Sequence, residues 1–383
     1  MIYLDNAATT QPSTKVIRAM AECMEQQWHN PSSGYTASNE VTKQIQEARA
    51  KVAALIDASP DEIYFTSGGT ESNNTALTSV HTMLPEDAVM ATSQIEHSAT
   101  LRPMELIAKS GRKVEYLPVD VGGRVIVPKS FSVAFLSVMS ANNETGIRQP
   151  IDELSTLSQE QGVAFHTDAV QLIGKERFSV KQTPVDMLSI SGHKFNGPKG
   201  VGALYVRSGF RFAPLLHGGG QESGKRSGTE NVPGIIGMGV AAEEAYQRDC
   251  SQRVAEMRDA FEKKVLETVQ GSEVNGDVNH RLPSHSHLSF DGCEAEGLVI
   301  LLDEYGLQCS SGSACMTGKQ QPSHVQLAMG FSEKKAKSSL RLSFSHLNTM
   351  EEAEKAAELV EKAVTKLRSV QNNSTGPVVV YTP

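Results

Sequence analysis

The sequence predicts an α/β protein in which a large domain, built on a mainly parallel sheet flanked by helices, precedes a smaller α+β domain. Three observations predict this. The chain has 383 residues, more than one hydrophobic core normally organises. Between residues 62 and 206, short apolar runs alternate with helical patterns, as in βαβ units. The last third of the chain instead mixes strands and helices, as an α+β domain does.

Helices are expected where apolar residues recur every three to four positions, and strands where short apolar runs end at turn residues. Two helices precede the sheet, over Thr14–Gln27 and Ala37–Ile56. The predicted strands of the large domain are Glu62–Thr66, Ala88–Thr92, Lys113–Leu117, Ser132–Val138, Val163–Phe165, Val185–Ile190 and Val201–Val206. Helices are expected between them at Ser98–Ser110 and Ile151–Gln161, and one long helix or two joined helices over Gly234–Gln270.

The smaller domain is expected to contain strands at Leu288–Phe290 and Ser339–Phe344 and helices at Ala295–Glu304 and Met350–Val370. We therefore expect a large domain over residues 13–252. The small domain would combine residues 1–12 with 253–383 and end in an extended tail, Gly376–Pro383.

Composition restricts the classes of function. The net charge of −8 argues against nucleic acid as the main partner and predicts no attraction to a membrane surface. The first residues resemble no signal peptide, and no apolar run of about 18 residues exists. The five cysteines show no C-x-x-C spacing, so reduced thiols in the cytoplasm are expected.

The most informative stretch is M-L-S-I-S-G-H-K-F-N-G-P-K-G, residues 187–200. Lys194 follows an apolar strand between glycines, where a lysine can enter a cleft, and burial disfavours its ammonium form. A neutral lysine amine attacks carbonyls and can hold a cofactor aldehyde. Ser191 and His193 flank it with groups that bind phosphate, so pyridoxal phosphate is the hypothesis. The alternative is a surface lysine in a turn.

A second candidate follows the predicted strand Glu62–Thr66, where Ser67-Gly68-Gly69-Thr70 leads into a helix. This order of strand, glycine turn, hydroxyl and helix offers backbone N–H groups to an anion. It has neither the P-loop spacing nor G-x-G-x-x-G. The alternative is an ordinary helix with Thr70 or Ser67 as its N-cap.

Further polar residues follow other predicted strands, and ligands of such sheets bind at the carboxyl ends of the strands. We expect Thr70, His97, Asn143, Asp168, Gln171 and Lys194 to share one cleft. An aspartate beside a pyridine nitrogen keeps it protonated, and a histidine over the ring can act as acid, base and stacking partner. Alternatively, His97 and Asp168 are helix caps and Asn143 lies in a plain turn.

Two loops carry further candidates. The glycine-rich loop Leu216–Glu230 is predicted to become ordered only against phosphate or a neighbouring subunit. In the C-terminal part, Cys315 lies in a run of small polar residues, so it is expected to be exposed and able to swing, on a loop of about residues 309–322. Cys309 is expected to be buried, and a Cys309–Cys315 disulfide or metal pair is an alternative. Arg341, in a strand beside this loop, could bind a carboxylate in bidentate fashion or form a surface ion pair.

The chain resembles the NifS/IscS-type cysteine desulfurases of the class V, fold type I pyridoxal-phosphate (PLP) enzymes over nearly its whole length. The resemblance rests on ordered motifs, which are L-D-N-A-A-T-T at 4–10, N-P-S-S at 30–33, T-S-G-G-T-E-S-N at 66–73, E-H at 96–97, N-N-E-T-G at 142–146, T-D-A-V-Q at 167–171, S-G-H-K-F-N-G-P-K-G at 191–200, R-S-G-T-E-N at 226–231, S-S-G-S-A-C at 310–315 and S-S-L-R-L-S at 338–343.

The resemblance implies a role for each candidate. Lys194 would be the Schiff-base lysine and His97 the stacking acid–base residue. Asp168 would pair with the pyridine nitrogen and Gln171 with the ring hydroxyl. Phosphate would be bound by Gly69, Thr70, Ser191 and His193, joined by Thr229 from the other subunit of a homodimer. Asn143 and Arg341 would bind the substrate carboxylate, and Asn143 would also lie at the cofactor. Cys315 would accept the sulfur.

The implied reaction converts L-cysteine to L-alanine and leaves a persulfide on Cys315 for an acceptor protein, such as an iron–sulfur scaffold or another sulfur carrier. Two alternatives stay open. The first is a selenocysteine lyase or another class V enzyme, although an aminotransferase would not need Cys315. The second is a non-catalytic scaffold for iron–sulfur cluster assembly. The sequence does not identify the acceptor.

Overall fold

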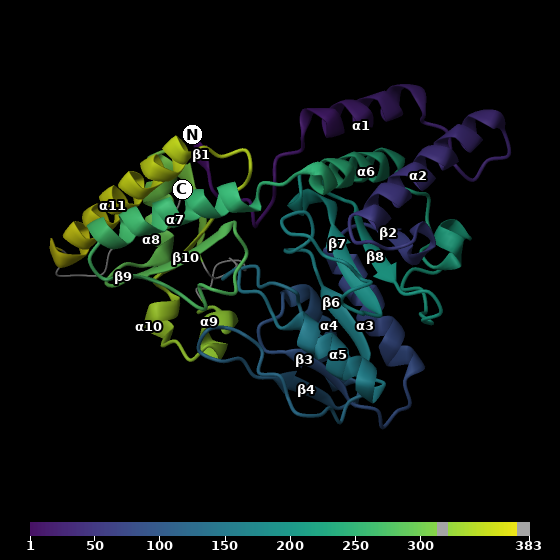
Figure 1. Ribbon diagram of the computed structural model, residues 1–383, viewed down its shortest axis with the longest axis horizontal. Helices are drawn as coiled ribbons and strands as arrows, with labels where there is room; N and C mark the ends of the chain where they lie inside the picture. The colour runs from purple at the N-terminus through teal and green to yellow at the C-terminus, as the bar shows by residue number, and fades with distance from the viewer. Residues whose placement is uncertain (312–320, 374–383) are drawn as a thin grey trace.

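The structure is a computed structural model that describes residues 1–311 and 321–373. It has two parts of unequal size, connected through helix α6 (Val232–Gln247) and helix α7 (Ser251–Thr268). The larger part contains a seven-stranded sheet, and the smaller part contains a four-stranded sheet (Figure 1). The tail predicted over residues 376–383 lies outside the described residues.

The large sheet has the strand order β2-β8-β7-β6-β5-β3-β4. Its strands are β2 (Ile63–Thr66), β3 (Met90–Ser93), β4 (Val114–Leu117), β5 (Phe135–Ser137), β6 (Ala164–Asp168), β7 (Met187–Ser191) and β8 (Gly202–Val206). Neighbouring strands pair in parallel except around β8, which is antiparallel to both β2 and β7. All strands except β8 therefore run in one direction, and their carboxyl ends lie at the same edge.

Helices cover both faces of this sheet, as expected for an α/β layer structure. One hydrophobic cluster joins the sheet to α3 (Gly69–Met83) and α4 (Ser98–Lys109). A larger cluster on the other face joins it to α2 (Thr36–Ala54), α5 (Ile151–Gln161) and α6. Helix α1 (Thr14–Gln26) packs on α6 and contributes Val16 and Cys23 to the larger cluster.

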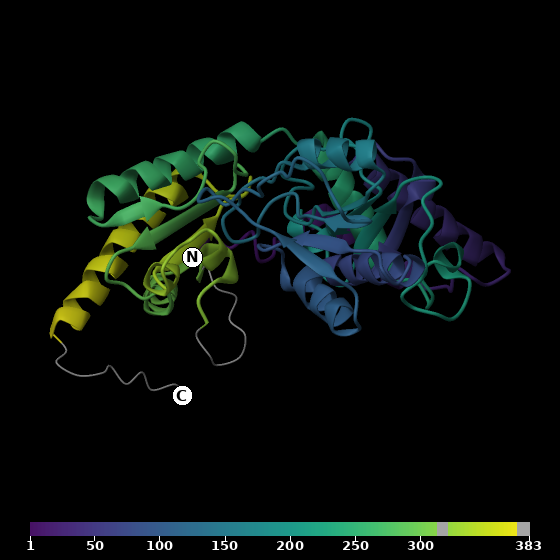
Figure 2. The same cartoon turned by 90° about the horizontal axis from the view of Figure 1, so that it is seen from below.

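The small part is built on a sheet of order β12-β13-β10-β9. Its strands are β9 (Ser272–Val274), β10 (His285–Phe290), β12 (Ser310–Ser311) and β13 (Ser339–Ser343). Helix α7, α8 (Ala295–Glu304) and α11 (Met350–Asn373) bury one face of it. Both views show α7 and α11 side by side on the outer side of this sheet (Figures 1 and 2).

The beginning of the chain belongs to the small part in space. Strand β1 (Ile2–Tyr3) pairs in parallel with β11 (Leu307–Gln308), and Leu4 is part of the small hydrophobic core. The remaining short elements are the 3-10 turns η1 (Pro60–Glu62), η2 (Gly192–Lys194) and η3 (Gln221–Gly224) and the helices α9 (His324–Ala328) and α10 (Glu333–Ala336).

The predicted fold class is confirmed, and most predicted elements lie within a few residues of the observed ones. Helix α8 has the predicted bounds. The predicted strand Val163–Phe165 was too short, because β6 continues to Asp168 through His166 and Thr167, whose polar side chains are buried within the protein. The segment Gly234–Gln270 forms two helices, α6 and α7, with a break at residues 248–250.

Contacts within its own chain hold part of the loop Leu216–Glu230. Glu222 accepts from both terminal nitrogens of Arg49, at 2.7 Å each. Arg226 forms an ion pair with Glu71 at 2.9 Å. Such bidentate pairs have a defined geometry. Contacts within the chain therefore hold part of this loop, and its ordering against phosphate or a neighbouring subunit stays a prediction.

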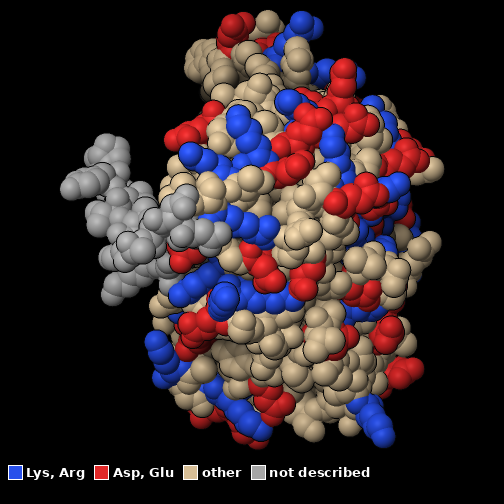
Figure 3. All heavy atoms as spheres, turned by 90° about the vertical axis from the view of Figure 1, so that its left-hand side faces the viewer, with Lys and Arg blue, Asp and Glu red and all other residues tan. Residues whose placement is uncertain are grey.

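The face of the small part seen in Figure 3 carries acidic and basic side chains intermingled rather than a field of one sign. Within the described ranges, no helix combines the length and the apolar character that a membrane span needs.

Candidate active site

The candidate residues come together because parallel strands end at one edge of the large sheet. Strand β6 ends at Asp168, β7 ends at Ser191, and β2 is followed by the N-terminus of α3. His97 follows β3, and Asn143 follows β5. The small part lies over this edge and adds Arg341 from β13. The predicted common cleft therefore exists at the edge where α/β sheets bind their ligands.

A cavity of about 560 Å³ occupies this place. The sequence-predicted residues that line it are Gly69, Thr70, His97, Asn143, Asp168, Gln171, Ser191, His193, Lys194 and Arg341. Thr229 does not line the cavity of its own chain and is exposed. Cys315 lies outside the described residues.

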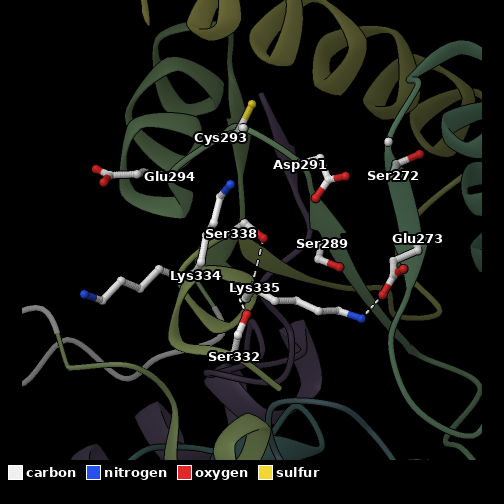
Figure 4. Close-up of a pocket in the computed structure, with 13 residues that line it drawn as sticks. Ser272, Glu273, Ser289, Asp291, Cys293, Glu294, Ser332, Lys334, Lys335 and Ser338 are labelled. Carbon is white, nitrogen blue, oxygen red and sulfur yellow. Dashed lines mark hydrogen bonds and ion pairs between the residues drawn. The ribbon is translucent and has the colours of Figure 1, made fainter. Parts of the chain in front are cut away.

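A second hollow, of about 470 Å³, lies in the small part near the end of β10 (Figure 4). Lys334, Lys335 and Lys337 line it together with serines and acidic residues, and Lys335 is paired with Glu273. Of the predicted site residues that the structure describes, none lines this hollow. The candidate site is therefore the cavity between the two parts of the protein.

Lys194 lies at the end of η2, directly after β7. Its Nζ donates to the backbone oxygens of Ala7 and Ala8, at 2.6 and 2.7 Å. Burial and the positive charge of Arg341 lower its pKa to about 8, although Asp168 and Asp5 act in the opposite direction. The amine is thus neutral more often near neutral pH than that of an ordinary lysine. A neutral amine in a cavity can attack an aldehyde carbon.

His97 is the N-cap of α4, so the capping interpretation is confirmed. Its Nδ1 accepts the backbone N–H of Ala99 at 3.1 Å. Burial lowers the pKa of the ring, and Lys194 adds to this while Asp168 opposes it. Since Nδ1 accepts, the neutral ring carries its proton on Nε2. Capping therefore leaves Nε2 as the ring nitrogen available to a ligand in the cavity that His97 lines.

Asp168 has both carboxylate oxygens engaged at the end of β6. Oδ2 accepts from Nδ2 of Asn73 at 2.6 Å, and Oδ1 accepts from the backbone of Val170 at 3.0 Å. The residue is buried. These contacts hold the carboxylate in one orientation against the cavity without neutralising its charge by a cation, so it can pair with a protonated ring nitrogen.

One end of the cavity is suited to an anion. Among the described residues, no side chain caps the first turn of α3, which begins at Gly69. Its N-cap is Gly68, so neither Thr70 nor Ser67 is the N-cap. A Cβ at position 69 would lie 2.7 Å from Cγ2 of Val170, which explains the glycine. The Ser191 hydroxyl lies near this turn, since its Oγ would be 3.8 Å from a Cβ added at Gly68. Backbone N–H groups at a helix N-terminus bind phosphate.

His193 also lines the cavity. Burial, together with the charge of Lys194, lowers its pKa to about 4, so the ring is neutral near pH 7. Its Nδ1 lies 3.1 Å from the hydroxyl of Thr9. A neutral imidazole still offers one N–H to an anion.

Arg341 is buried and not part of a surface ion pair. Its Nη2 donates to Oδ1 of Asp5 at 2.7 Å, and its Nη1 donates to the backbone oxygen of Asn143 at 2.9 Å. The guanidinium has five N–H donors, so others remain for a carboxylate in the cavity. Asp5 also accepts from the hydroxyl of Ser310 at 2.9 Å, which ties β12 to the beginning of the chain.

Sequence reasoning missed several polar residues of the site, although they lie within or beside the quoted motifs. Asn73 holds Asp168, and Asp5 holds Arg341. Glu144 lines the cavity, and its Oε2 accepts from the Ser323 hydroxyl at 2.5 Å. Burial raises the pKa of Glu144 to about 7, although Ser323 and Arg341 lower it. No local pattern distinguishes these residues from turn or helix residues.

Comparison with known proteins identifies the family. A sequence profile of class-V aminotransferases matches residues 2–356. The chain belongs to this family. It is 41% identical over 377 residues to cysteine desulfurase 2 of Trichormus variabilis, covering 97% of this chain and 94% of that protein. A solved NifS-like protein superposes with a TM-score of 0.88 at 35% identity, covering 96% of this chain and all (100%) of that one. The structure of SspA in complex with cysteine superposes with a TM-score of 0.79 at 34% identity, covering 90% of this chain and 99% of that one.

The family is PLP-dependent, and the residues present fit this cofactor. The cavity offers an amine with a lowered pKa on Lys194 and a carboxylate on Asp168. It also offers an uncapped helix N-terminus at Gly69, where any side chain would fill the space beside Val170. These three groups match the aldehyde, the pyridine nitrogen and the phosphate of PLP, respectively.

Proposed function

We propose that this protein is a PLP-dependent cysteine desulfurase that converts L-cysteine to L-alanine and passes the sulfur to Cys315. The observation that carries the proposal is the cavity of about 560 Å³ in which Lys194, His97, Asp168 and Arg341 converge. The names of the similar proteins, which include a cysteine desulfurase and a cysteine complex, support the choice of reaction and substrate.

The cofactor would be held by groups already described. Lys194 would attach it covalently, Asp168 would pair with the ring nitrogen, and His97 would stack on the ring. Gln171 would face the ring hydroxyl. The groups for the phosphate would be Gly69, Thr70, Ser191 and His193. When bound, PLP supplies an electron sink that stabilises a carbanion next to the carbon–sulfur bond.

Arg341 and Asn143 would hold the carboxylate of the amino-acid substrate. Asp5 and the Asn143 carbonyl each take one guanidinium N–H, and this fixes the plane of the guanidinium. The remaining N–H groups form the bidentate fork that suits a carboxylate. This arrangement supports recognition of an α-amino acid near Lys194.

Proton transfer is assigned to Lys194 and His97. With a pKa of about 8, the free amine of Lys194 can take up and return a proton near neutral pH. His97 keeps Nδ1 occupied by the backbone of Ala99, so any proton it transfers must pass through Nε2.

Two cysteines are candidates for accepting the sulfur, and Cys309 is the poorer one. Cys309 lines the cavity, but burial and the charge of Asp5 raise the pKa of its thiol to about 12. The nucleophilic form of cysteine is the thiolate. This leaves Cys315, which lies in a run of small residues, as the proposed acceptor.

We further propose a homodimer, with Thr229 of each chain reaching the phosphate of the other. Its exposure, and its position away from the cavity of its own chain, support this. The proposed domain boundaries, 13–252 for the large domain and 1–12 with 253–383 for the small one, are supported by a separate core that contains Leu4 and residues of α7, α8 and α11. Val325 of α9 belongs instead to the larger core. The described cysteines are free, which supports a cytoplasmic location and delivery of sulfur to an acceptor protein there, such as an iron–sulfur scaffold.

The experiment compares Cys315→Ser with Cys309→Ser on addition of L-cysteine. Cys315→Ser should bind PLP normally, change its absorbance with L-cysteine, and give neither alanine nor added sulfur, because serine is a poor nucleophile towards sulfur. Cys309→Ser should keep persulfide formation, which mass spectrometry detects. Alanine at the wild-type rate from Cys315→Ser, or a persulfide on Cys309, would show the assignment to be wrong.

A further inference from the structure

Lys175 is a lysine beside the cavity that the proposed mechanism does not use. Its Nζ donates to Oε1 of Gln171 at 2.5 Å. Within the described residues, it has no carboxylate partner. Burial lowers its pKa well below the ordinary value, and the charges of Lys194 and Arg341 lower it further. A lysine surrounded by positive groups is costly to keep, since an unpaired buried charge loses its hydration.

The backbone fixes this lysine close to Lys194. Gly174 has φ +83°, and a Cβ there would lie 2.4 Å from Cβ of Phe195. The turn at Gly174 is therefore packed directly against the residue that follows Lys194, and no side chain fits between them. Lys175 and Lys194 also line a common small cavity of about 40 Å³ behind the main one. The proximity of the two lysines is thus a consequence of the close approach at Gly174.

The contacts of Gln171 determine which of its amide atoms faces which neighbour. Lys175 donates to Oε1, and Nε2 donates to the backbone oxygen of Ala7 at 3.0 Å. A flipped amide would place N–H groups against the ammonium and its oxygen against a carbonyl, two repulsive contacts. Nε2 carries two hydrogens and donates one of them to the backbone oxygen of Ala7. The remaining N–H is what Gln171 can offer to the cavity that it lines.

We propose that Lys175 is a positioning residue that orients the Gln171 amide to donate to an anionic oxygen of the cofactor, and that its positive charge strengthens this hydrogen bond. The inference rests on the proposed function, because the anionic oxygen is the ring oxygen of PLP. The negative charge of the bound cofactor favours the ammonium form of Lys175, which burial and the neighbouring cations disfavour in its absence, and so takes the place of the missing carboxylate partner. Lys175 itself does not touch the cofactor and acts through Gln171.

Lys175→Met should change the ionisation of the bound cofactor. Loss of the cation and freedom of the Gln171 amide to turn both destabilise the anionic oxygen next to the Lys194 linkage. Both effects make that linkage easier to protonate, so they have the same sign. A hydrogen bond to a charged group corresponds to a shift of about one to two pH units. The midpoint of the visible-band titration should therefore rise by about one pH unit or more.

The measurement is a pH titration of the visible absorbance of the purified holoenzyme, with thermal melting to check the fold. Lys175→Arg keeps a charged donor and should restore the wild-type midpoint. Lys181→Met, an exposed lysine on the same segment, is the matched control and should change nothing. In a Gln171→Leu background, Lys175→Met should add only the smaller charge effect, because the amide is no longer there to orient.

Two results would overturn the inference. The first is a Lys175→Met holoenzyme whose visible-band titration midpoint is unchanged while its melting temperature falls, since this would show that Lys175 has a purely structural role. The second is a Lys175→Met substitution that shifts the titration midpoint equally in the wild-type and in the Gln171→Leu background. If Lys175→Met does not fold, Lys175→Gln, which keeps an N–H donor without the charge, must still raise the midpoint. A wild-type protein with no titrating visible band would instead refute the proposed PLP function.

Discussion

The low pKa of Lys194 predicts how fast PLP attaches to the apoprotein at different pH values. Only the neutral amine attacks an aldehyde, so the rate should rise with a midpoint near pH 8. At pH 7.5, about a quarter of such lysines are neutral, against about one in a thousand for an ordinary lysine of pKa about 10.5. The environment of Lys194 should therefore increase the reactive fraction about 200-fold.

Two substitutions test the cause of this shift with opposite signs. Burial is the largest cause and the charge of Arg341 is the next, so Arg341→Met should raise the midpoint by removing a cation that disfavours the ammonium. Asp5 stabilises the ammonium of Lys194, so Asp5→Asn should lower the midpoint. The two residues pair with each other, at 2.7 Å, and opposite shifts would show that charge acts rather than loss of the pair itself.

The assay is stopped-flow absorbance in the visible range, with apoprotein and excess PLP over a range of pH. The same reaction with Nα-acetyl-lysine amide provides the reference, and the ratio of the two rates removes the ionisations of PLP itself. A midpoint near the ordinary lysine value would refute the reasoning. So would midpoints that move in the same direction in both variants.

Three further predictions concern the site, the fold and the assembly. Asp168→Asn should retain some PLP but lose alanine production about a hundredfold or more, because an amide does not hold the ring nitrogen protonated; near-normal activity would leave Asp168 only a turn cap. Gly146→Ala should lower the free energy of unfolding by about 2–4 kcal/mol, measured in denaturant, because φ is +75° and the new Cβ would lie 2.3 Å from Cβ of His285. Gly162→Ala, at φ +68° with nothing within 4 Å, is its control and should cost only about 1 kcal/mol. Sedimentation should find a dimer, and Thr229→Ala should weaken PLP retention while the protein remains dimeric. An active monomer would contradict this prediction.

The local sequence was sufficient to predict the elements and the place of the site. Short-range chemistry decides where helices and strands begin and end, so α8 and most strands of the large sheet were predictable from apolar spacing and turn residues. Strand alternation also implied that Asp168 and Lys194 would meet at one sheet edge. The motifs then named the family, which the comparisons confirmed.

Only the tertiary structure decided which partners tune these residues. Arg341 and Asp5 are 336 positions apart, so no local pattern relates them. The pKa of about 8 for Lys194 comes from burial and from the charge of Arg341, in a cavity that Ala7, near the beginning of the chain, and Arg341, near its end, both line. Sequence records which groups exist, whereas burial and Coulomb interactions depend on distances through space. Residue types therefore predicted the chemistry of the site, whereas its electrostatics depend on how distant segments of the chain pack together.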